Sequence, residues 1–145
     1  MKKQRVLFLC TGNSGRSQLA EAIVNARLAD RWEAFSAGVR PAAAVHPLIS
    51  KVLAESGIPF SGQPKSADRF RNTAFDLVVT LCDSARQECP LWLGSGERVH
   101  HDYPDPALME GTEAERLSAV RKLRDDMLVE ILYLLERRGT GKMDL

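Results

Sequence analysis

The sequence predicts a three-layer α/β/α fold around a central, mostly parallel four-stranded sheet. Two observations support this prediction. Short apolar runs alternate along the chain with segments of helical periodicity. At least one of these runs is continuously apolar, as in parallel strands that are covered on both faces. With 145 residues, 44% of them hydrophobic, the chain has the size of one ordinary domain, and we expect a single domain over residues 1–145.

The first half of the chain is expected to form strand, helix, strand and helix in turn. Residues 5–9 read as a short buried strand, and residues 17–28 carry apolar side chains at helical spacing. Residues 32–39 alternate between apolar and polar side chains, as a second strand would. In the helix that follows, Pro47 suits the first turn and Gly57 suits the C-terminal cap.

The second half supplies two more strands and a long helix. Residues 75–82 are the continuous apolar run, residues 97–103 are a weaker strand candidate, and residues 112–138 show a helical apolar stripe. In parallel sheets of this kind, ligands bind beyond the carboxyl ends of the strands. Cys10 and Cys82 both fall at such ends, so we expect both thiols on the functional edge of the sheet.

Charge and composition narrow the function to a local site. The net charge is only +1, so no overall field attracts nucleic acid or a membrane surface, and we expect neither as a partner. No apolar segment has the length of a membrane span or of a signal peptide, which favours a cytoplasmic location. Three cysteines, an odd number, predict thiols that are reduced at rest rather than a disulfide framework.

The loop after the first strand has the composition of an oxyanion cradle. Gly12 and Gly15 can adopt positive φ angles, and Asn13 tolerates them. Such a turn can point successive backbone N–H groups inward at a helix N-terminus, where a tetrahedral anion is favoured. Arg16 adds a planar fork for two of the oxygens of the anion. The predicted oxyanion-binding residues are Thr11, Gly12, Asn13, Ser14, Gly15 and Arg16.

Cys10 enters this cradle as a candidate nucleophile. The amides and the guanidinium that bind an anion also favour the thiolate over the thiol. Ser17 is placed to donate a hydrogen bond to that thiolate. The alternative interpretation is a simple capping turn, in which Ser14 or Ser17 starts the helix and Arg16 is merely solvated.

The stretch "CTGNSGRS", a cysteine, five residues, an arginine and a serine near the start of the chain, resembles the low-molecular-weight protein tyrosine phosphatases and the arsenate reductases that share their fold. The resemblance extends from Arg5 to the C-terminal helix. It implies an Asp-Pro pair that protonates the departing oxygen, and Asp105-Pro106 supplies one. Asp102 is the rival candidate, but no proline follows it.

The two further cysteines distinguish the branches of this family. Reduction of arsenate requires two electrons, which two thiols can supply by forming a disulfide, whereas a phosphatase needs one thiolate and water. The spacing of Cys10, Cys82 and Cys89 resembles that of the thioredoxin-coupled arsenate reductases. The resemblance implies that Cys10 attacks arsenate, that Cys82 attacks the arsenic-bound sulfur and releases arsenite, and that Cys89 then attacks Cys82. Thioredoxin would reduce the resulting disulfide.

The relay also makes a structural demand. On a rigid helix, seven residues separate two thiols by about 10 Å of rise alone, which is too far for a disulfide. The polar segment 83–88 must therefore loosen, and thioredoxin is favoured over glutaredoxin or small thiols as the reductant of the exposed disulfide.

The sequence departs from the family at a cation site. Certain arsenate reductases bind potassium beneath the loop, and Asn13, Glu21 and Ser36 match the ligands of that site. Gln63 and Lys65 stand where a threonine and an aspartate would be, and the Lys65 ammonium can take the place of the metal. We therefore expect no metal and no cofactor. The histidines show no spacing with the cysteines that would indicate a metal site.

The predicted function is thus arsenate reduction, with arsenate as substrate and phosphate or sulfate as competing oxyanions. Catalysis is assigned to Cys10, Arg16, Ser17, Cys82, Cys89 and Asp105. Two alternatives stay open. One is a phosphatase acting on phosphotyrosine, although Ala107, Leu108 and Met109 replace the aromatic residues that usually follow the Asp-Pro pair. The other is a redox-sensing or anion-binding regulatory protein without turnover.

Overall fold

Four parallel strands form the sheet, in the spatial order β2-β1-β3-β4, in a computed structural model that describes residues 2–90 and 96–141. All three neighbouring pairs of strands are parallel, which confirms the predicted parallel sheet. The carboxyl ends of the strands therefore meet at one edge. The strands are β1 (Gln4–Cys10), β2 (Trp32–Gly38), β3 (Leu77–Thr80) and β4 (Glu97–His100).

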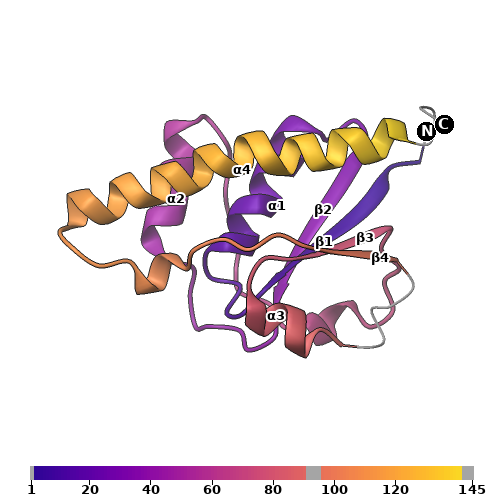
Figure 1. Ribbon diagram of the computed structural model, residues 1–145, viewed down its shortest axis with the longest axis horizontal. Coiled ribbons are helices and arrows are strands. Elements are labelled where there is room, and N and C mark those ends of the chain that lie inside the picture. The colour runs from indigo at the N-terminus through magenta and orange to yellow at the C-terminus, as the bar shows by residue number, and fades with distance from the viewer. Residues whose placement is uncertain (1, 91–95, 142–145) are drawn as a thin grey trace.

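Helices cover the sheet on both sides (Figure 1). The helices α1, α2 and α4 contact one another on one face, whereas α3 packs against β1 and β3 from the other face. This arrangement confirms the predicted three layers. The helices are α1 (Arg16–Arg27), α2 (Pro47–Glu55), α3 (Asp83–Glu88) and α4 (Glu113–Gly141), with short 3-10 turns at η1 (Ala67–Phe70) and η3 (Pro106–Leu108).

The boundaries of two strands differ from the prediction. The strand β3 is shorter than the predicted segment 75–82, because the chain leaves the sheet before Cys82, which caps α3 instead. The strand β4 ends at His100 rather than at residue 103. The predicted helix ends of α2 are confirmed: Pro47 occupies its first position, and Gly57, just beyond it, has a φ of +69°.

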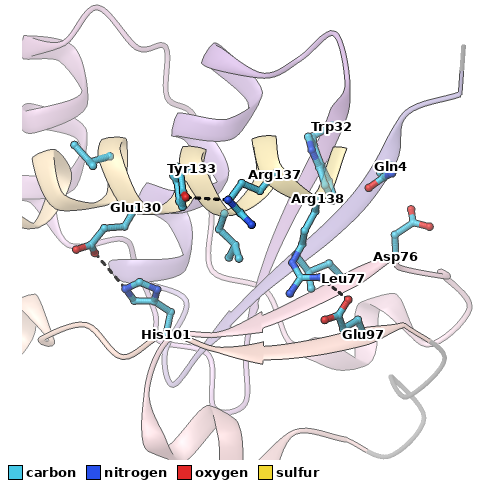
Figure 2. A pocket seen from close by; sticks show the side chains of 12 residues that line it. Gln4, Trp32, Asp76, Leu77, Glu97, His101, Glu130, Tyr133, Arg137 and Arg138 are labelled. Carbon is cyan, nitrogen blue, oxygen red and sulfur yellow. Dashed lines mark hydrogen bonds and ion pairs between the residues drawn. The ribbon is translucent and has the colours of Figure 1, made fainter. Parts of the chain in front are cut away.

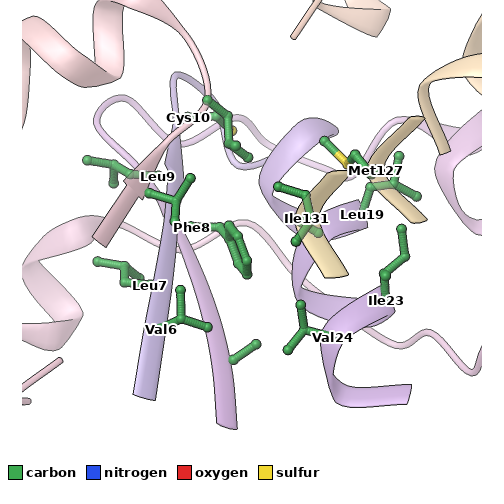
Figure 3. Packing of buried hydrophobic residues seen from close by; sticks show 14 of the residues in the cluster. Val6, Leu7, Phe8, Leu9, Cys10, Leu19, Ile23, Val24, Met127 and Ile131 are labelled. Atoms are coloured by element: carbon green, nitrogen blue, oxygen red, sulfur yellow. The ribbon is translucent and has the colours of Figure 1, made fainter. Parts of the chain in front are cut away.

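The strand β1 lies at the centre of the hydrophobic core (Figure 3). Val6 and Phe8 point toward α1 and α4, and Leu7 and Leu9 point toward the opposite face. All four side chains are fully buried. Since core packing is as dense as in a crystal, the strand gives Cys10 at its end a rigid base.

The long helix α4 lies across α1 and α2 and closes the core on their side. It buries one stripe of apolar side chains, and further leucines beside this stripe are partly buried. Across residues 2–90 and 96–141, none of the helices combines the length and the apolar character that crossing a bilayer requires. The buried stripe consists of Val120, Leu123, Met127, Ile131 and Leu135.

Candidate functional site

Cys10 is the last residue of β1, and α1 begins six residues later at Arg16. Cys10 is only 2% exposed. The hydroxyl of Ser17 lies 2.8 Å from Cys10 Sγ, and the backbone N–H of Asn13 donates to the same sulfur at 3.3 Å. The Asn13 N–H donates to this sulfur, and the Ser17 hydroxyl can donate to it as well, so both groups can stabilise a thiolate. The predicted contact between Ser17 and the thiol is therefore present.

Asn13 holds the shape of the loop. It has a φ of 52°, whereas neither Gly12 nor Gly15 is among the positive-φ residues. Of the three loop residues that the sequence marks as able to adopt a positive φ, Asn13 is the one that does so, and in that conformation it gains side-chain hydrogen bonds that no glycine can make. Its Nδ2 donates to Ser17 Oγ at 2.7 Å, and its Oδ1 accepts from Gln18 Nε2 at 3.0 Å and from the Lys65 amide at 2.8 Å.

Arg16 and Asp105 come together although 89 positions separate them. The Arg16 side chain is buried, donates through Nη1 to the Tyr103 carbonyl at 3.2 Å, and lies with Nη2 3.3 Å from Asp105 Oδ2. The other Asp105 oxygen accepts from the amide of Ala107 at 2.9 Å. Asp102, the rival candidate, is largely exposed and lies beside His100 instead. The geometry thus selects Asp105 as the carboxylate next to the cradle.

Cys82 lies at the N-cap of α3, next to the loop that holds Cys10. Its sulfur is 3.2 Å from the hydroxyl of Thr11 and accepts from the amide of Ala85 at 3.4 Å. Cys89 lies at the other end of the same helix and is half-buried. All three cysteines are free thiols in this structure. The short helix α3 separates Cys82 from Cys89 and holds the two sulfurs apart.

The ammonium of Lys65 occupies the predicted cation position. Its Nζ donates to Ser36 Oγ at 3.4 Å and to the Gln63 carbonyl at 3.2 Å, and it lies 3.9 Å from Glu21 Oε1. Burial lowers the pKa of Lys65, and the negative charge of Glu21 partly offsets this effect. A cation already stands among these oxygens, so the residues do not fit a potassium ion as well.

Gly38, the last residue of β2, shapes the loop although no sequence motif marks it. A Cβ atom there would lie 2.7 Å from the carbonyl oxygen of Thr11 and 2.9 Å from the backbone nitrogen of Asn13. Gly38 pairs in register with Cys10 across the sheet. The loop can fold against β2 only because this position lacks a side chain. Its place at the end of a predicted strand was the one signal that could have found it.

His100 has neighbours that sequence spacing did not reveal. Its Nδ1 lies 2.8 Å from Thr80 Oγ1, and its Nε2 faces Asp83 and Asp102. Ligand atoms of these three titratable residues lie within 4.8 Å of one another and could hold a divalent cation. Exposed carboxylate groups of this kind are common without a metal, and we assign no ion here.

Tyr103, an aromatic residue near the Asp-Pro pair, turns its hydroxyl toward α4. Tyr103 is buried, and its hydroxyl donates to Glu130 at 2.8 Å. Burial and this carboxylate raise its pKa. Trp92 lies outside the described residues. After the Asp-Pro pair, Leu108 is 76% exposed, so the residue at this position presents an aliphatic surface.

A hollow of about 820 Å³ lies away from the cysteines, between α4 and the strands β3 and β4 (Figure 2). Tyr133 and Arg137 line it from the helix, and Glu97 and His101 line it from the sheet side. It contains no thiol and none of the loop residues. The size of a hollow is weaker evidence for chemistry than converging reactive groups, and we place the site at Cys10.

Comparisons with known proteins agree with this geometry. Residues 5–138 match the family model described as low molecular weight phosphotyrosine protein phosphatase. An arsenate reductase of Halalkalibacterium halodurans is 42% identical over 143 residues, which are 98% of this chain and all of that protein.

Two solved structures extend the likeness to the fold. The structure of an arsenate reductase in the phosphate binding state has a TM-score of 0.74 and 26% identity, with 92% of this chain and 98% of that chain covered. A thioredoxin-dependent arsenate reductase of Corynebacterium glutamicum has a TM-score of 0.67 and 28% identity, with 92% and 61% covered. The sequence motif, the sheet order and these matches together show that the chain belongs to the low molecular weight phosphotyrosine protein phosphatase family.

Proposed function

We propose that the protein reduces arsenate to arsenite and passes the oxidation to a disulfide between Cys82 and Cys89. The observation that carries this proposal is the second thiol at the cradle: Cys82 Sγ lies 3.2 Å from the hydroxyl of Thr11, the residue that follows Cys10 in the chain. A phosphatase has no use for this thiol. The arsenate reductases among the relatives, at about 42% identity for the one described above, support the same reaction.

In the first step, the cradle binds arsenate and the Cys10 thiolate attacks arsenic. A sulfur–arsenic bond forms and the bond from arsenic to one arsenate hydroxyl breaks. Arg16, buried beneath the site, neutralises the charge of the equatorial oxygens. Asp105, beside Arg16, gives its proton to the departing hydroxyl, which leaves as water. The hydrogen bonds of Ser17 and the Asn13 amide hold the sulfur in place for the attack.

In the second step, the Cys82 thiolate attacks Cys10 Sγ. A disulfide forms between these residues, the sulfur–arsenic bond breaks, and its electron pair stays on arsenic, which leaves as arsenite. Two thiols are oxidised and arsenic is reduced by two electrons. The Thr11 hydroxyl and the Ala85 amide support the Cys82 thiolate, because both can donate to its sulfur.

In the third step, Cys89 attacks Cys82 and frees Cys10 for another cycle. The redox segment, residues 82–89, must unwind for this step, since its six-residue helix lies between the two sulfurs. Of its helical residues only Ala85 is buried. A helix this short has little stability of its own, so the unwinding costs little.

Thioredoxin is the proposed reductant of the Cys82–Cys89 disulfide. The unwound segment exposes this bond, and a structural relative is named for its dependence on thioredoxin. A reductant of this kind implies a reducing compartment, so we place the protein in the cytoplasm. Phosphate and sulfate have the same tetrahedral shape and should compete with arsenate for the cradle.

Phosphatase activity is the second candidate, because the same cradle also fits phosphate and the family is named for phosphotyrosine. The aliphatic Leu108 beside the Asp-Pro pair offers no aromatic face for a phenyl ring. Weak hydrolysis of small phosphate esters is therefore expected as a side activity. A regulatory protein without turnover is the third candidate, and it would consume no more than one equivalent of arsenate.

A coupled assay tests the proposal. Arsenate-dependent NADPH oxidation is measured with thioredoxin and thioredoxin reductase on the parent, Cys82→Ser and Cys89→Ser. Both variants should lose turnover, and Cys89→Ser should still release about one equivalent of arsenite per protein. Hydrolysis of p-nitrophenyl phosphate should persist in both variants, which controls for an intact cradle. Turnover at the parental rate in both variants would contradict the relay.

A further inference from the structure

Arg98 lies on β4 and contacts the chain next to Cys89, the residue that ends the redox segment. Its Nη2 donates to the carbonyl of Pro90, the residue after Cys89, at 2.8 Å. Arg98 pairs with Val78 in the sheet register, so its backbone position is fixed by the parallel ladder. The guanidinium is thus held from the sheet against the chain at Cys89.

The other arginines near the redox segment pair with carboxylates. Arg86 pairs with Asp83 at 3.2 Å, and Arg40 makes a two-pronged contact with Glu88. Within residues 2–90 and 96–141, no carboxylate forms an ion pair with Arg98. The charge of Arg98 therefore remains available to its neighbours.

Cys89 needs such a charge. Burial raises the pKa of its thiol, and the positive charge of Arg98 acts in the opposite direction. Glu88, the acidic neighbour of Cys89, is engaged by Arg40. Only the thiolate attacks a disulfide, so a half-buried thiol with a raised pKa reacts slowly unless a nearby cation favours its ionised form.

We propose that Arg98 is a positioning residue for the last thiol exchange: held at the Pro90 carbonyl, it places a positive charge beside Cys89 and favours the attacking thiolate. The inference rests on the proposed relay. In that step the Cys89 thiol gives its proton to water, its sulfur bonds to Cys82, the Cys10–Cys82 bond breaks, and Cys10 leaves as a thiolate. No external oxidant or reductant is needed.

The test measures Cys89 without turnover. In a Cys10→Ser, Cys82→Ser background Cys89 is the only thiol, and serine is a good N-cap at position 82. The rate of alkylation by iodoacetamide is recorded against pH. Arg98→Ala should move the midpoint of this profile to higher pH and lower the rate at pH 7 by about three-fold. Arg98→Lys should keep the midpoint near that of the parent.

Arg86→Ala is the matched control, because it removes a cation that Asp83 already neutralises, and it should leave the midpoint unchanged. An unshifted midpoint in Arg98→Ala would overturn the inference, as would equal shifts in Arg98→Ala and Arg98→Lys or in Arg98→Ala and Arg86→Ala. The relay is judged separately: if Cys89→Ser turns over arsenate like the parent, the proposed function fails whatever the alkylation shows.

Discussion

The loop of residues 10–17 and the redox segment 82–89 both place cysteines at the carboxyl edge of the sheet, but the fold holds them in opposite ways. In the loop, Cys10, Asn13 and Ser17 are at most 2% exposed and are joined by hydrogen bonds. In the redox segment, one helical side chain is buried and the ion pairs lie on the surface. Surface ion pairs contribute about 0–1 kcal/mol each.

This difference matches two kinds of chemistry. Binding and attacking a tetrahedral anion requires groups that stay in place throughout the reaction. Passing a disulfide along three cysteines requires a sulfur that travels, because α3 keeps Cys82 and Cys89 at its two ends. A single domain can serve both needs if the loop of residues 10–17, the fixed site, is anchored in the core. The redox segment, residues 82–89, is then the mobile region, since it is a short helix at the edge of the domain.

Loss of Arg16 should give the largest effect, because it is the buried cation of the fixed site. We expect Arg16→Ala to lower kcat/KM for arsenate by about 10²–10³-fold. Steady-state kinetics in the thioredoxin-coupled assay measure the loss. Arg27→Ala removes an exposed arginine from the end of the same helix and should change kcat/KM by less than about two-fold. Equal losses in both variants would contradict the role of Arg16.

Gly38 tests whether the fixed site depends on close backbone packing. The Cβ of Gly38→Ala would collide with the backbone of the loop, so we expect a loss of about 1–3 kcal/mol in unfolding free energy and weaker phosphate binding. Denaturation and isothermal titration measure the two effects. Gly57→Ala is the control: its Cβ has open space, and its positive φ costs about 1 kcal/mol without any effect on phosphate binding. A Gly38→Ala protein with parental phosphate affinity would refute the packing argument.

Lys65 tests the built-in cation. The melting temperature of the parent should differ by less than about 1 °C between potassium and sodium chloride. Lys65→Asp replaces the ammonium with a carboxylate near Glu21, so potassium but not sodium should raise its melting temperature. A parent protein that potassium stabilises, or activates, would show that the ammonium does not fill the site.

Arg40 tests the mobile region and should give the smallest effect. Its pair with Glu88 ties the last turn of α3 to the chain after β2, and both side chains are exposed. Arg40→Ala should speed formation of the Cys82–Cys89 disulfide by no more than about three-fold and leave the KM for arsenate unchanged. Rapid quenching after a single addition of arsenate gives the rate. A raised KM for arsenate would mean that Arg40 belongs to the anion site.

Most of the fixed site could be predicted from the sequence, because its parts are contiguous: one strand, five loop residues and the first turn of one helix. The apolar run before Cys10 and the helical spacing after Ser17 locate them without any long-range information. Asn13 was harder, since its conformation depends on N–H donors of Gln18 and Lys65 that only the fold brings to its Oδ1.

Contacts between distant segments could be predicted from the sequence less well. Gly38 depends on the register of β1 with β2, and the charge beside Cys89 depends on the register of β3 with β4, which puts Arg98 opposite Val78. Neither register follows from a pattern of apolar residues. The pairing of Asp105 with the cradle was predictable only because a known motif marks it.

Amide hydrogen exchange tests the division between the fixed and mobile regions most directly. The reduced protein is compared with protein that has been oxidised by arsenate to the Cys82–Cys89 disulfide. Protection should fall in residues 83–90 of the oxidised form and remain unchanged in residues 10–17. Equal protection of residues 83–90 in the two forms, or a loss of protection in the loop of Cys10, would contradict the account.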